Sequence, residues 1–347
     1  MPGPLAGLKI IELGSIGPGP FCGMLLADAG ATVIRIERRG AHVDPTDAML
    51  RSRKILHLDL KSANDREALI DMLEDADGIF EGMRPGTLER LGLAPDILLA
   101  KNPRLVVGRM TGWGQTGPLS GAAGHDINYI ALSGALHGIG PAEHPIPPLA
   151  LVGDFGGGGM LLAFSMTAAI LYARTSGKGQ IIDCAMTEGS GQLMAAFYSY
   201  MASGLWRDTR EANVVDGGAH FYGVYETRDR KFVSIGSIEP QFYALLLQTL
   251  GLENDERFMD QMDTSNWPEL KNVLASIFKK KTQAEWCAIM ENTDICFAPV
   301  LSMADAPSHP HARARGSFVE VEGIVHPAPA PKYSLTPLPP PRPARTI

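Results

Sequence analysis

Three ionisable side chains lie in turns marked by glycine or proline, where proton-transfer chemistry is commonly placed. The first is His125, in the segment GHDINY that follows the glycine-rich stretch 111–124. An imidazole exchanges protons near neutral pH, so His125 is a candidate general acid or base. An isolated histidine is more often structural, and the local sequence does not decide between the two roles. The neighbouring Asp126 is interpreted as the N-cap of a helix.

The second candidate is Asp154, in the segment VGDF, which is followed by four consecutive glycines. Glycines at the start of a helix leave backbone N–H groups accessible, and a helix N-terminus stabilises negative charge. One interpretation is therefore a carboxylate beside an anion site that a ligand approaches closely. The other is an ordinary helix cap, and the sequence leaves both open.

The third candidate is Glu239, which stands just before Pro240 in the segment SIEPQ. Proline is favoured at the first position of a helix, so Glu239 is expected at a helix start. A solvated N-terminal acid would explain it equally well. Its spacing from His125 does not connect the two residues.

Residues of these types suit the inversion of a weakly acidic carbon. That reaction needs one base to remove the proton and a different acid to return it on the opposite face. The two groups must differ in protonation state, and the negative oxygen of the intermediate must be stabilised. His125 and Asp154 could supply such a pair.

Short β-branched runs alternate with helical stretches through the first 185 residues, which predicts a parallel sheet with covering helices. Helices are expected over 21–29, from Ser62 or Asn64 to about Glu74, and from the glycines at 156–159 through Arg174. Strands are expected over 8–13, 31–37, 55–60, 78–81, 105–107 and 180–185. The predicted fold class is α/β, with a large Rossmann-like domain.

A polar, glycine-rich stretch at 206–218 predicts a connector to a second unit. Beyond it, 221–227 and 231–236 form a predicted hairpin, and helices are expected over 241–250, 268–278 and 283–292. The expected domains are residues 1–200 with about 320–347, a linker at 201–219, and a smaller α+β domain at 220–319. Many of the 26 prolines follow residue 327, which predicts an extended strap that wraps another surface.

The net charge of −7 argues against a nucleic-acid-binding protein, because such proteins rely on cationic surface. The four cysteines form no CxxC pair, so zinc binding is not expected and the thiols are predicted to stay reduced. No secretory signal is recognised in the first ten residues. The apolar run 160–172 is shorter than the roughly 20 residues of a membrane span, so no membrane association is expected. The last residues, ARTI, are not a peroxisomal signal of the SKL type, and a cytoplasmic location is expected.

Gly14, Gly17 and Gly19 follow a predicted strand, and Glu37 ends the next one, which imitates a dinucleotide-binding fingerprint. The spacing is GxxGxG rather than GxGxxG, and Pro18 and Pro20 remove N–H donors that a pyrophosphate would need. A tight glycine turn beside a ligand or a partner chain is the better interpretation.

Several motifs in order resemble the α-methylacyl-CoA racemases of the family III CoA-transferase superfamily. They are GPGP at 17–20, MLRSR at 49–53, RPG at 84–86, ERLGL at 89–93, TGWGQTGP at 111–118, GHDINY, VGDFGGG and IEPQF at 238–242. The resemblance extends from the N-terminus to about residue 340. Several ordered motifs are far more specific than any single one.

The resemblance implies that His125, hydrogen-bonded to Glu239, serves one face of the 2-carbon and that Asp154 serves the other. It also implies interlocked homodimers in which Glu239 comes from the partner chain. The implied substrate is a 2-methyl-branched acyl-CoA, and no separate cofactor is expected because coenzyme A is part of the substrate. The residues implied to bind substrate or coenzyme A are Arg38, Leu58, Lys61, Arg84, Arg90, Tyr129 and Gly153.

Two alternatives remain at this level. In a CoA-transferase of the same superfamily, the aspartate at position 154 would be a nucleophile that carries acyl groups and then coenzyme A. A non-catalytic acyl-CoA carrier would leave His125, Asp154 and Glu239 without a task. The motifs around His125 and Glu239 favour the racemase, because a transferase does not require that pair.

Overall fold

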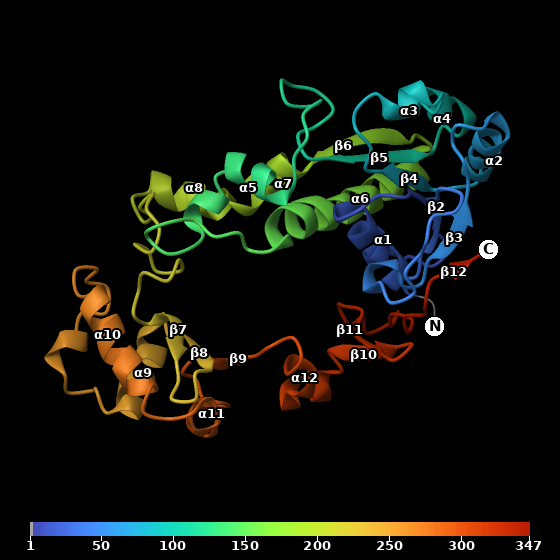
Figure 1. Ribbon diagram of the computed structural model, residues 1–347. Coiled ribbons are helices and arrows are strands. Elements are labelled where there is room, and N and C mark those ends of the chain that lie inside the picture. The colour runs from blue at the N-terminus through green and yellow to red at the C-terminus, as the bar shows by residue number, and fades with distance from the viewer. Residues whose placement is uncertain (1–2) are drawn as a thin grey trace. The chain divides into compact units, whose positions relative to one another are not determined.

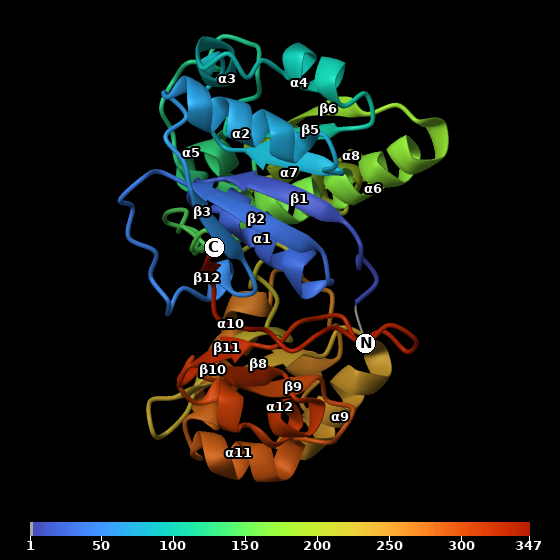
Figure 2. The same cartoon turned by 90° about the vertical axis from the view of Figure 1, so that its right-hand side faces the viewer.

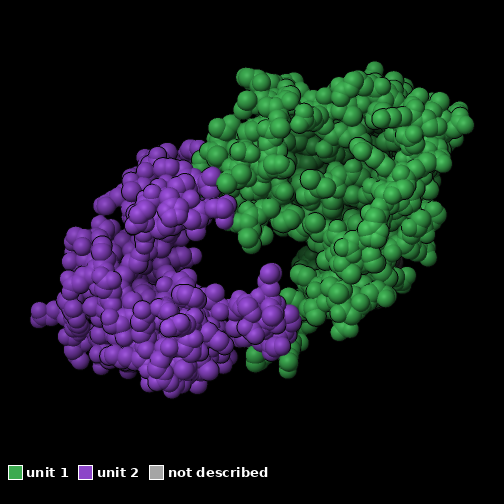
Figure 3. Space-filling model, viewed as in Figure 1, with its two compact units in different colours: residues 1–135, 148–195, 310–347 green, residues 136–147, 196–309 purple. Residues whose placement is uncertain are grey.

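The computed structural model describes residues 3–347, which form two compact units (Figure 3). Unit 1 contains the described residues up to 135 together with 148–195 and 310–347, and unit 2 contains 136–147 and 196–309. This division differs from the expected domains, because 136–147 and the whole expected linker belong to unit 2. Unit 1 also resumes at 310 rather than at about 320.

Unit 1 is built on a seven-stranded parallel sheet in the order β12-β3-β2-β1-β4-β5-β6 (Figure 1). The chain starts in the middle, adds β2 and β3 on one side of β1, and then crosses to add β4, β5 and β6 on the other. The strands are β1 Lys9–Leu13, β2 Thr32–Glu37, β3 Lys54–His57, β4 Gly78–Glu81, β5 Val106–Thr111, β6 Gln180–Ala185 and β12 Arg345–Thr346. The predicted parallel α/β sheet is confirmed.

Helices cover both faces of this sheet, because successive strand residues point to opposite sides. Figure 2 shows α1 and α6 on one face and α2 and α4 on the other. Ile10 belongs to the core with α1 and α6, whereas Ile11 belongs to the core with α2 and α4. Both isoleucines are fully buried. The helices of this unit are α1 Pro18–Asp28, α2 Ala63–Leu73, α3 Thr87–Arg90, α4 Pro95–Lys101, α5 Asp126–Leu132, α6 Leu161–Ser176, α7 Met186–Leu193 and α12 Pro310–Arg315.

The apolar run that was expected to be too short for a membrane is part of a longer helix. A π-helical segment, Leu151–Met160, continues directly into α6, and the 26 residues from Leu151 to Ser176 are long and apolar enough to cross a membrane. The length argument made from sequence is therefore wrong. Leu162, Met166 and Ile170 of this helix pack into the core of unit 1.

Unit 2 is an α+β unit with its own core. Its three-stranded antiparallel sheet contains β7 Tyr222–Glu226, β8 Phe232–Gly236 and β9 Phe297–Val300. The predicted hairpin is β7–β8, whereas β9 was not predicted because the run FAPV contains a proline. The helices are α9 Pro240–Leu250, α10 Trp267–Phe278 and α11 Gln283–Met290, and α8 Ala195–Ala202 begins at the boundary of the unit.

The proline-rich end of the chain returns to unit 1. A hairpin of β10 Phe318–Val321 and β11 Ile324–Pro327 precedes an extended segment that ends in β12. Because β12 pairs with β3, this segment forms the edge of the large sheet. The expected strap thus lies against the sheet of its own unit.

Candidate active site

A cavity lies between β1 and β4, where the order in which the chain adds strands to the sheet reverses. β1 and β4 are neighbours whose following segments leave toward opposite faces, and ligands bind parallel sheets at such switch points, outside the carboxyl ends of the strands. A cavity of about 360 Å³ lies there. Its walls come from the segments after β1, β4 and β5, from 120–129, and from the π-helix.

The segment after β1 is a tight turn into α1 rather than a long loop. Gly17 has φ 67°, a left-handed conformation that favours glycine, and Pro18 is the first residue of α1. A side chain at Gly17 would place its Cβ 2.7 Å from Oδ2 of Asp154. Gly17, one of the glycines that imitate a dinucleotide fingerprint, therefore makes room for the Asp154 carboxylate at the N-terminus of α1.

Asp154 lies inside the π-helix and is not a helix cap, so that interpretation is wrong. π-Helical segments are rare and often occur at functional sites. The glycines that follow make close contacts with other parts of the protein. A Cβ at Gly157 would lie 2.6 Å from the backbone nitrogen of Ser190 in α7, and one at Gly159 would lie 2.6 Å from the carbonyl oxygen of Pro18. The glycine run thus lets the π-helix pack directly against α1 and α7.

His125, not Asp126, is the N-cap residue of α5, which corrects the prediction for Asp126. The backbone N–H of His125 donates to Oδ1 of Asn128 at 3.0 Å. Asp126 is buried, and its Oδ1 accepts a hydrogen bond of 2.7 Å from the backbone N–H of Asp154. Asp126 therefore connects the start of α5, which carries His125, to the π-helix, which carries Asp154.

The cavity raises the pKa of Asp154. Burial is the main cause, the negative charge of Asp126 adds to it, and His125 opposes it. A raised pKa makes Asp154 easier to protonate, as a group that both gives and takes a proton requires. Since His125 and Asp154 line the same cavity, the two predicted groups lie together rather than in separate pockets.

Tyr129 and Arg84 line the cavity as well. The Tyr129 hydroxyl donates to the carbonyl of Gly124, and its ring packs edge-to-face on Trp113 with centroids 4.8 Å apart. Burial and the charge of Asp154 raise the pKa of Tyr129, whereas Arg84 lowers it. The two acidic residues nearest to Arg84 in the sequence, Glu81 and Glu89, both pair with Arg109 instead. The cavity therefore contains a cation that is available to an anionic ligand.

The other predicted binding residues lie outside this cavity. Arg38 follows β2, Lys61 follows β3 and Arg90 ends α3, and all three are exposed. The Leu58 side chain is buried in the core between the sheet and α2, so only its backbone could contact a ligand. Gly153 packs against Asp126, since a Cβ there would overlap its carboxylate.

Glu239 belongs to unit 2, where it is the N-cap residue of α9. The side chain is exposed and makes no capping hydrogen bond. Its backbone carbonyl accepts hydrogen bonds from the N–H groups of Phe242 and Tyr243, each 3.0 Å long. The carboxylate is therefore free to interact with a group outside α9.

Several buried ion pairs that support the cavity were not predicted. Arg109 on β5 binds Glu81 at the end of β4 and Glu89 on α3, which fixes the segment that carries Arg84. Arg35 binds Glu12 and also donates to the carbonyl of Ser15 at 2.9 Å. A charged residue within an otherwise apolar strand, as in KIIEL, ATVIRIE and VVGRMT, was the available signal.

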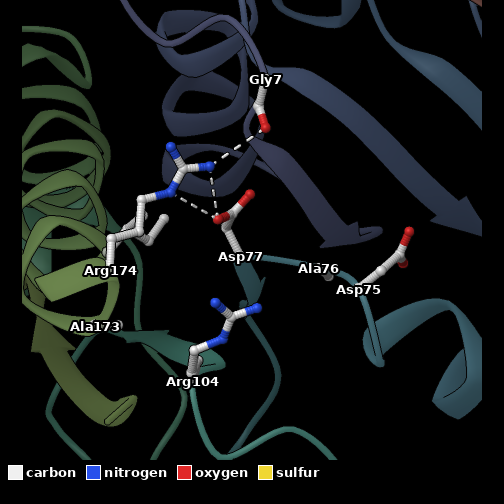
Figure 4. Close-up of a pocket in the computed structure, with 8 residues that line it drawn as sticks. Gly7, Asp75, Ala76, Asp77, Arg104, Ala173 and Arg174 are labelled. Atoms are coloured by element: carbon white, nitrogen blue, oxygen red, sulfur yellow. Dashed lines mark hydrogen bonds and ion pairs between the residues drawn. The ribbon is translucent and has the colours of Figure 1, made fainter. Parts of the chain in front are cut away.

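A second hollow in unit 1 lies at the opposite edge of the sheet, where β1, β4 and β5 begin (Figure 4). Arg174 pairs with Asp77 and also contacts the carbonyl of Gly7, and Lys9 pairs with Asp75. These charges neutralise one another at the surface. The contacts around this hollow therefore connect α6 and the start of β1 to the segment that precedes β4.

Comparison with known proteins agrees with this geometry. Residues 5–344 match the model of the CoA-transferase family III. The chain is 46% identical to the alpha-methylacyl-CoA racemase of Mus musculus and 43% identical to that of Homo sapiens, covering 96% of this chain and 87% of each relative. It is also 32% identical to the acetyl-CoA:oxalate CoA-transferase of Acetobacter aceti, over 94% of this chain and 88% of that protein. Among solved structures, a CAIB/BAIF family protein from Brucella suis has the same fold, with a TM-score of 0.84 at 24% identity over 100% of this chain and 96% of that one.

Proposed function

Because the chain belongs to the CoA-transferase family III, we propose that it is a racemase that inverts the 2-carbon of 2-methyl-branched acyl-CoA thioesters. The observation that carries the proposal is the placement of His125 and Asp154, from two different elements, in one cavity at the switch point of the sheet. The similarity to two alpha-methylacyl-CoA racemases over 96% of the chain supports the same assignment.

The reaction we propose moves one proton through an enolate. One of the two groups removes the proton from C2, the C2 electron pair delocalises into the thioester carbonyl, and the other group returns a proton to the opposite face. His125 and Asp154 exchange protonation states in each turnover. The raised pKa of Asp154 brings its proton affinity closer to that of the imidazole, which lowers the cost of either direction.

Coenzyme A would be held along the carboxyl edge of the sheet. Arg84 is in the cavity wall, and Arg38 and Lys61 follow strands that end at the same edge. Cations there suit the phosphates of coenzyme A. Binding energy from the nucleotide would help to hold the reacting carbon between His125 and Asp154.

A homodimer would bring Glu239 of one chain to His125 of the other. The exposed faces of the π-helix and α6 carry large apolar side chains that water solvates poorly, including Met160, Phe164 and Leu171, which are 55%, 70% and 67% exposed. A partner chain would cover such a surface. A carboxylate from the partner would orient the imidazole and stabilise its protonated form.

Solvent exchange gives the direct test of racemisation. A single enantiomer of a 2-methylacyl-CoA is incubated with the enzyme in heavy water, and loss of the 2-hydrogen is followed by NMR together with configuration. We expect exchange and inversion at C2, with inversion lost in His125→Ala and Asp154→Asn that keep the wild-type circular dichroism. Inversion at the wild-type rate in either variant would remove that residue from the mechanism, whereas exchange of one enantiomer without inversion would identify the face that the remaining group serves.

Co-expression of two inactive chains tests where Glu239 acts. If it serves the partner's site, a heterodimer of His125→Ala and Glu239→Ala contains one intact site and recovers up to half of the activity. If it serves its own chain, every site lacks one group and no activity returns. Separately purified homodimers that are mixed without exchange of subunits provide the control.

A CoA-transferase is the second candidate, because family relatives include transferases and Asp154 is a carboxylate in the cavity. In that reaction Asp154 would form an acyl anhydride and then a CoA thioester. Transfer of coenzyme A to free succinate, oxalate or formate, with trapping of Asp154 by hydroxylamine, would establish it. Racemisation without such transfer would exclude it.

A further inference from the structure

Two buried arginines, Arg51 and Arg53, bind the two ends of α1. Arg51 forms a two-point ion pair with Asp28, the last residue of α1. Arg53 is almost fully buried, and its Nη2 donates to the carbonyl of Pro20 in the first turn at 2.5 Å. A single turn at 51–53 therefore sets both the position and the direction of α1.

The guanidinium of Arg53 is fixed from three sides. Nε binds Oε2 of the buried Glu12 at 3.0 Å, and Nη1 donates to the carbonyl of Arg51 at 3.1 Å. A Cβ at Gly23 would lie 2.5 Å from the Glu12 carboxylate, so α1 lies directly on this pair. Such a pair has no room to shift independently of the helix.

Residues 327–347, here called the tail segment, hold the same turn from outside. The carbonyl of Pro327 accepts from Nη1 of Arg51 at 2.6 Å, and the carbonyl of Arg342 accepts from the N–H of Ser52 at 2.7 Å. The N–H of Arg345 donates to the carbonyl of Arg53 at 3.1 Å, as part of the β12–β3 pairing. The tail segment thus contacts the turn at three successive residues.

Movement of α1 would reach the cavity directly. Gly17 and Pro18 at its start contact the Asp154 carboxylate and the glycines of the π-helix with no spare space. Gly19 lines the cavity itself. The position of α1 therefore determines how Asp154 is packed and how far it is shielded from water.

We propose that the tail segment is a clamp that positions Asp154 through Arg51, Arg53 and α1, although none of its residues lines the cavity. The clamp is a positioning device for the reaction proposed above, and its catalytic readouts rest on that function. Arg51 and Arg53 are positioning residues, because they act on Asp154 only through α1.

The matched test uses two prolines at adjacent positions of β12. Arg345→Pro removes the N–H that binds the Arg53 carbonyl. The N–H groups of Arg345 and Ile347 both donate to the β3 side, so the N–H of Thr346 between them points away from β3 and Thr346→Pro is the control. We expect Arg345→Pro to lower kcat for racemisation about tenfold, the scale of a sub-ångström misplacement, with an unchanged KM. Thr346→Pro should stay within about twofold of wild type on the same scale.

The pH profile separates positioning from partial unfolding. If α1 loosens, water reaches Asp154, its pKa falls, and the acid limb of the kcat profile moves to lower pH. A smaller folded fraction would lower the profile without moving it. Ser52→Gly, which removes the Oγ that accepts from the Arg342 N–H and suits the left-handed φ of 61° there, gives a milder second variant.

Hydrogen–deuterium exchange of the 17–28 amides tests the clamp without any enzymatic reaction. Faster exchange in Arg345→Pro than in Thr346→Pro supports the clamp, even if the protein proves not to be a racemase. Equal exchange and equal kcat in the two proline variants would overturn the proposal. Wild-type protein that racemises no 2-methylacyl-CoA would refute the proposed function and leave the exchange comparison valid.

Discussion

Replacing Gly189 by alanine tests whether the π-helix that carries Asp154 depends on direct backbone packing. Gly189 is buried in α7, and a Cβ there would lie 2.7 Å from the carbonyl carbon of Gly157 and 2.9 Å from its Cα. Both obstacles are main-chain atoms, which cannot rotate away. Two residues further along α7, a Cβ at Gly191 would meet nothing within 4 Å.

Replacing glycine by alanine should destabilise the protein at position 189 and stabilise it at position 191. Overpacking a core costs about 1–3 kcal/mol, and a main-chain obstacle places Gly189→Ala at the upper end. Alanine regains about 1 kcal/mol over glycine in a helix, which leaves a net loss of about 2 kcal/mol. Gly191→Ala receives only the gain, about 0.5–1 kcal/mol.

Thermal unfolding followed by circular dichroism measures both variants. At about 2–4 °C per kcal/mol for a unit of this size, Gly189→Ala should lower Tm by about 4–8 °C and Gly191→Ala should raise it by about 1–4 °C. The added methyl group would displace Gly157 and with it the π-helix that carries Asp154, so kcat should also fall in Gly189→Ala. A Tm that rises in both variants would refute the packing argument.

Three further predictions concern ionisable groups. Asp154→Asn should raise the stability of the protein at pH 7, because burial raises the pKa of Asp154 above its ordinary value of 3.8 and its ionised form is costly in the folded state. The gain should vanish below that ordinary pKa in denaturant titrations, and a gain that grows on acidification would contradict the reasoning. Burial lowers the pKa of His220 from its ordinary 6.5 to about 4. Between these two values only the unfolded chain binds the proton, so the free energy of unfolding should fall by about 1.4 kcal/mol for each unit by which the pH is lowered. His220→Gln should lose this slope, and an unchanged slope would assign it to other groups. Asp126→Asn should move the acid limb of the kcat profile to lower pH, because the charge of Asp126 raises the pKa of Asp154, and a shift to higher pH would show that the carboxylate acts otherwise.

Much of the large unit follows from local sequence. The apolar β-branched runs around Ile10 and Val33 predict buried parallel strands, because only such strands bury both faces. The unpredicted strand β9 contains Pro299, and the predicted helix start at Phe21 was late because Pro18 and Pro20 were assigned to a loop. Ordered motifs also identified His125, Asp154 and Glu239 as the residues of interest.

The sequence by itself determined the elements and the residue types available for proton transfer, because periodicity and turn chemistry are local properties of the chain. Only the tertiary structure decided that His125 and Asp154 share one cavity, because that depends on the chain crossing from β3 to β4 at the middle of the sheet. Tertiary packing also decided that Asp126 connects α5 to the π-helix and that the glycines of the π-helix contact α1 and α7. These roles arise between segments far apart in sequence, where no local pattern records which surfaces meet.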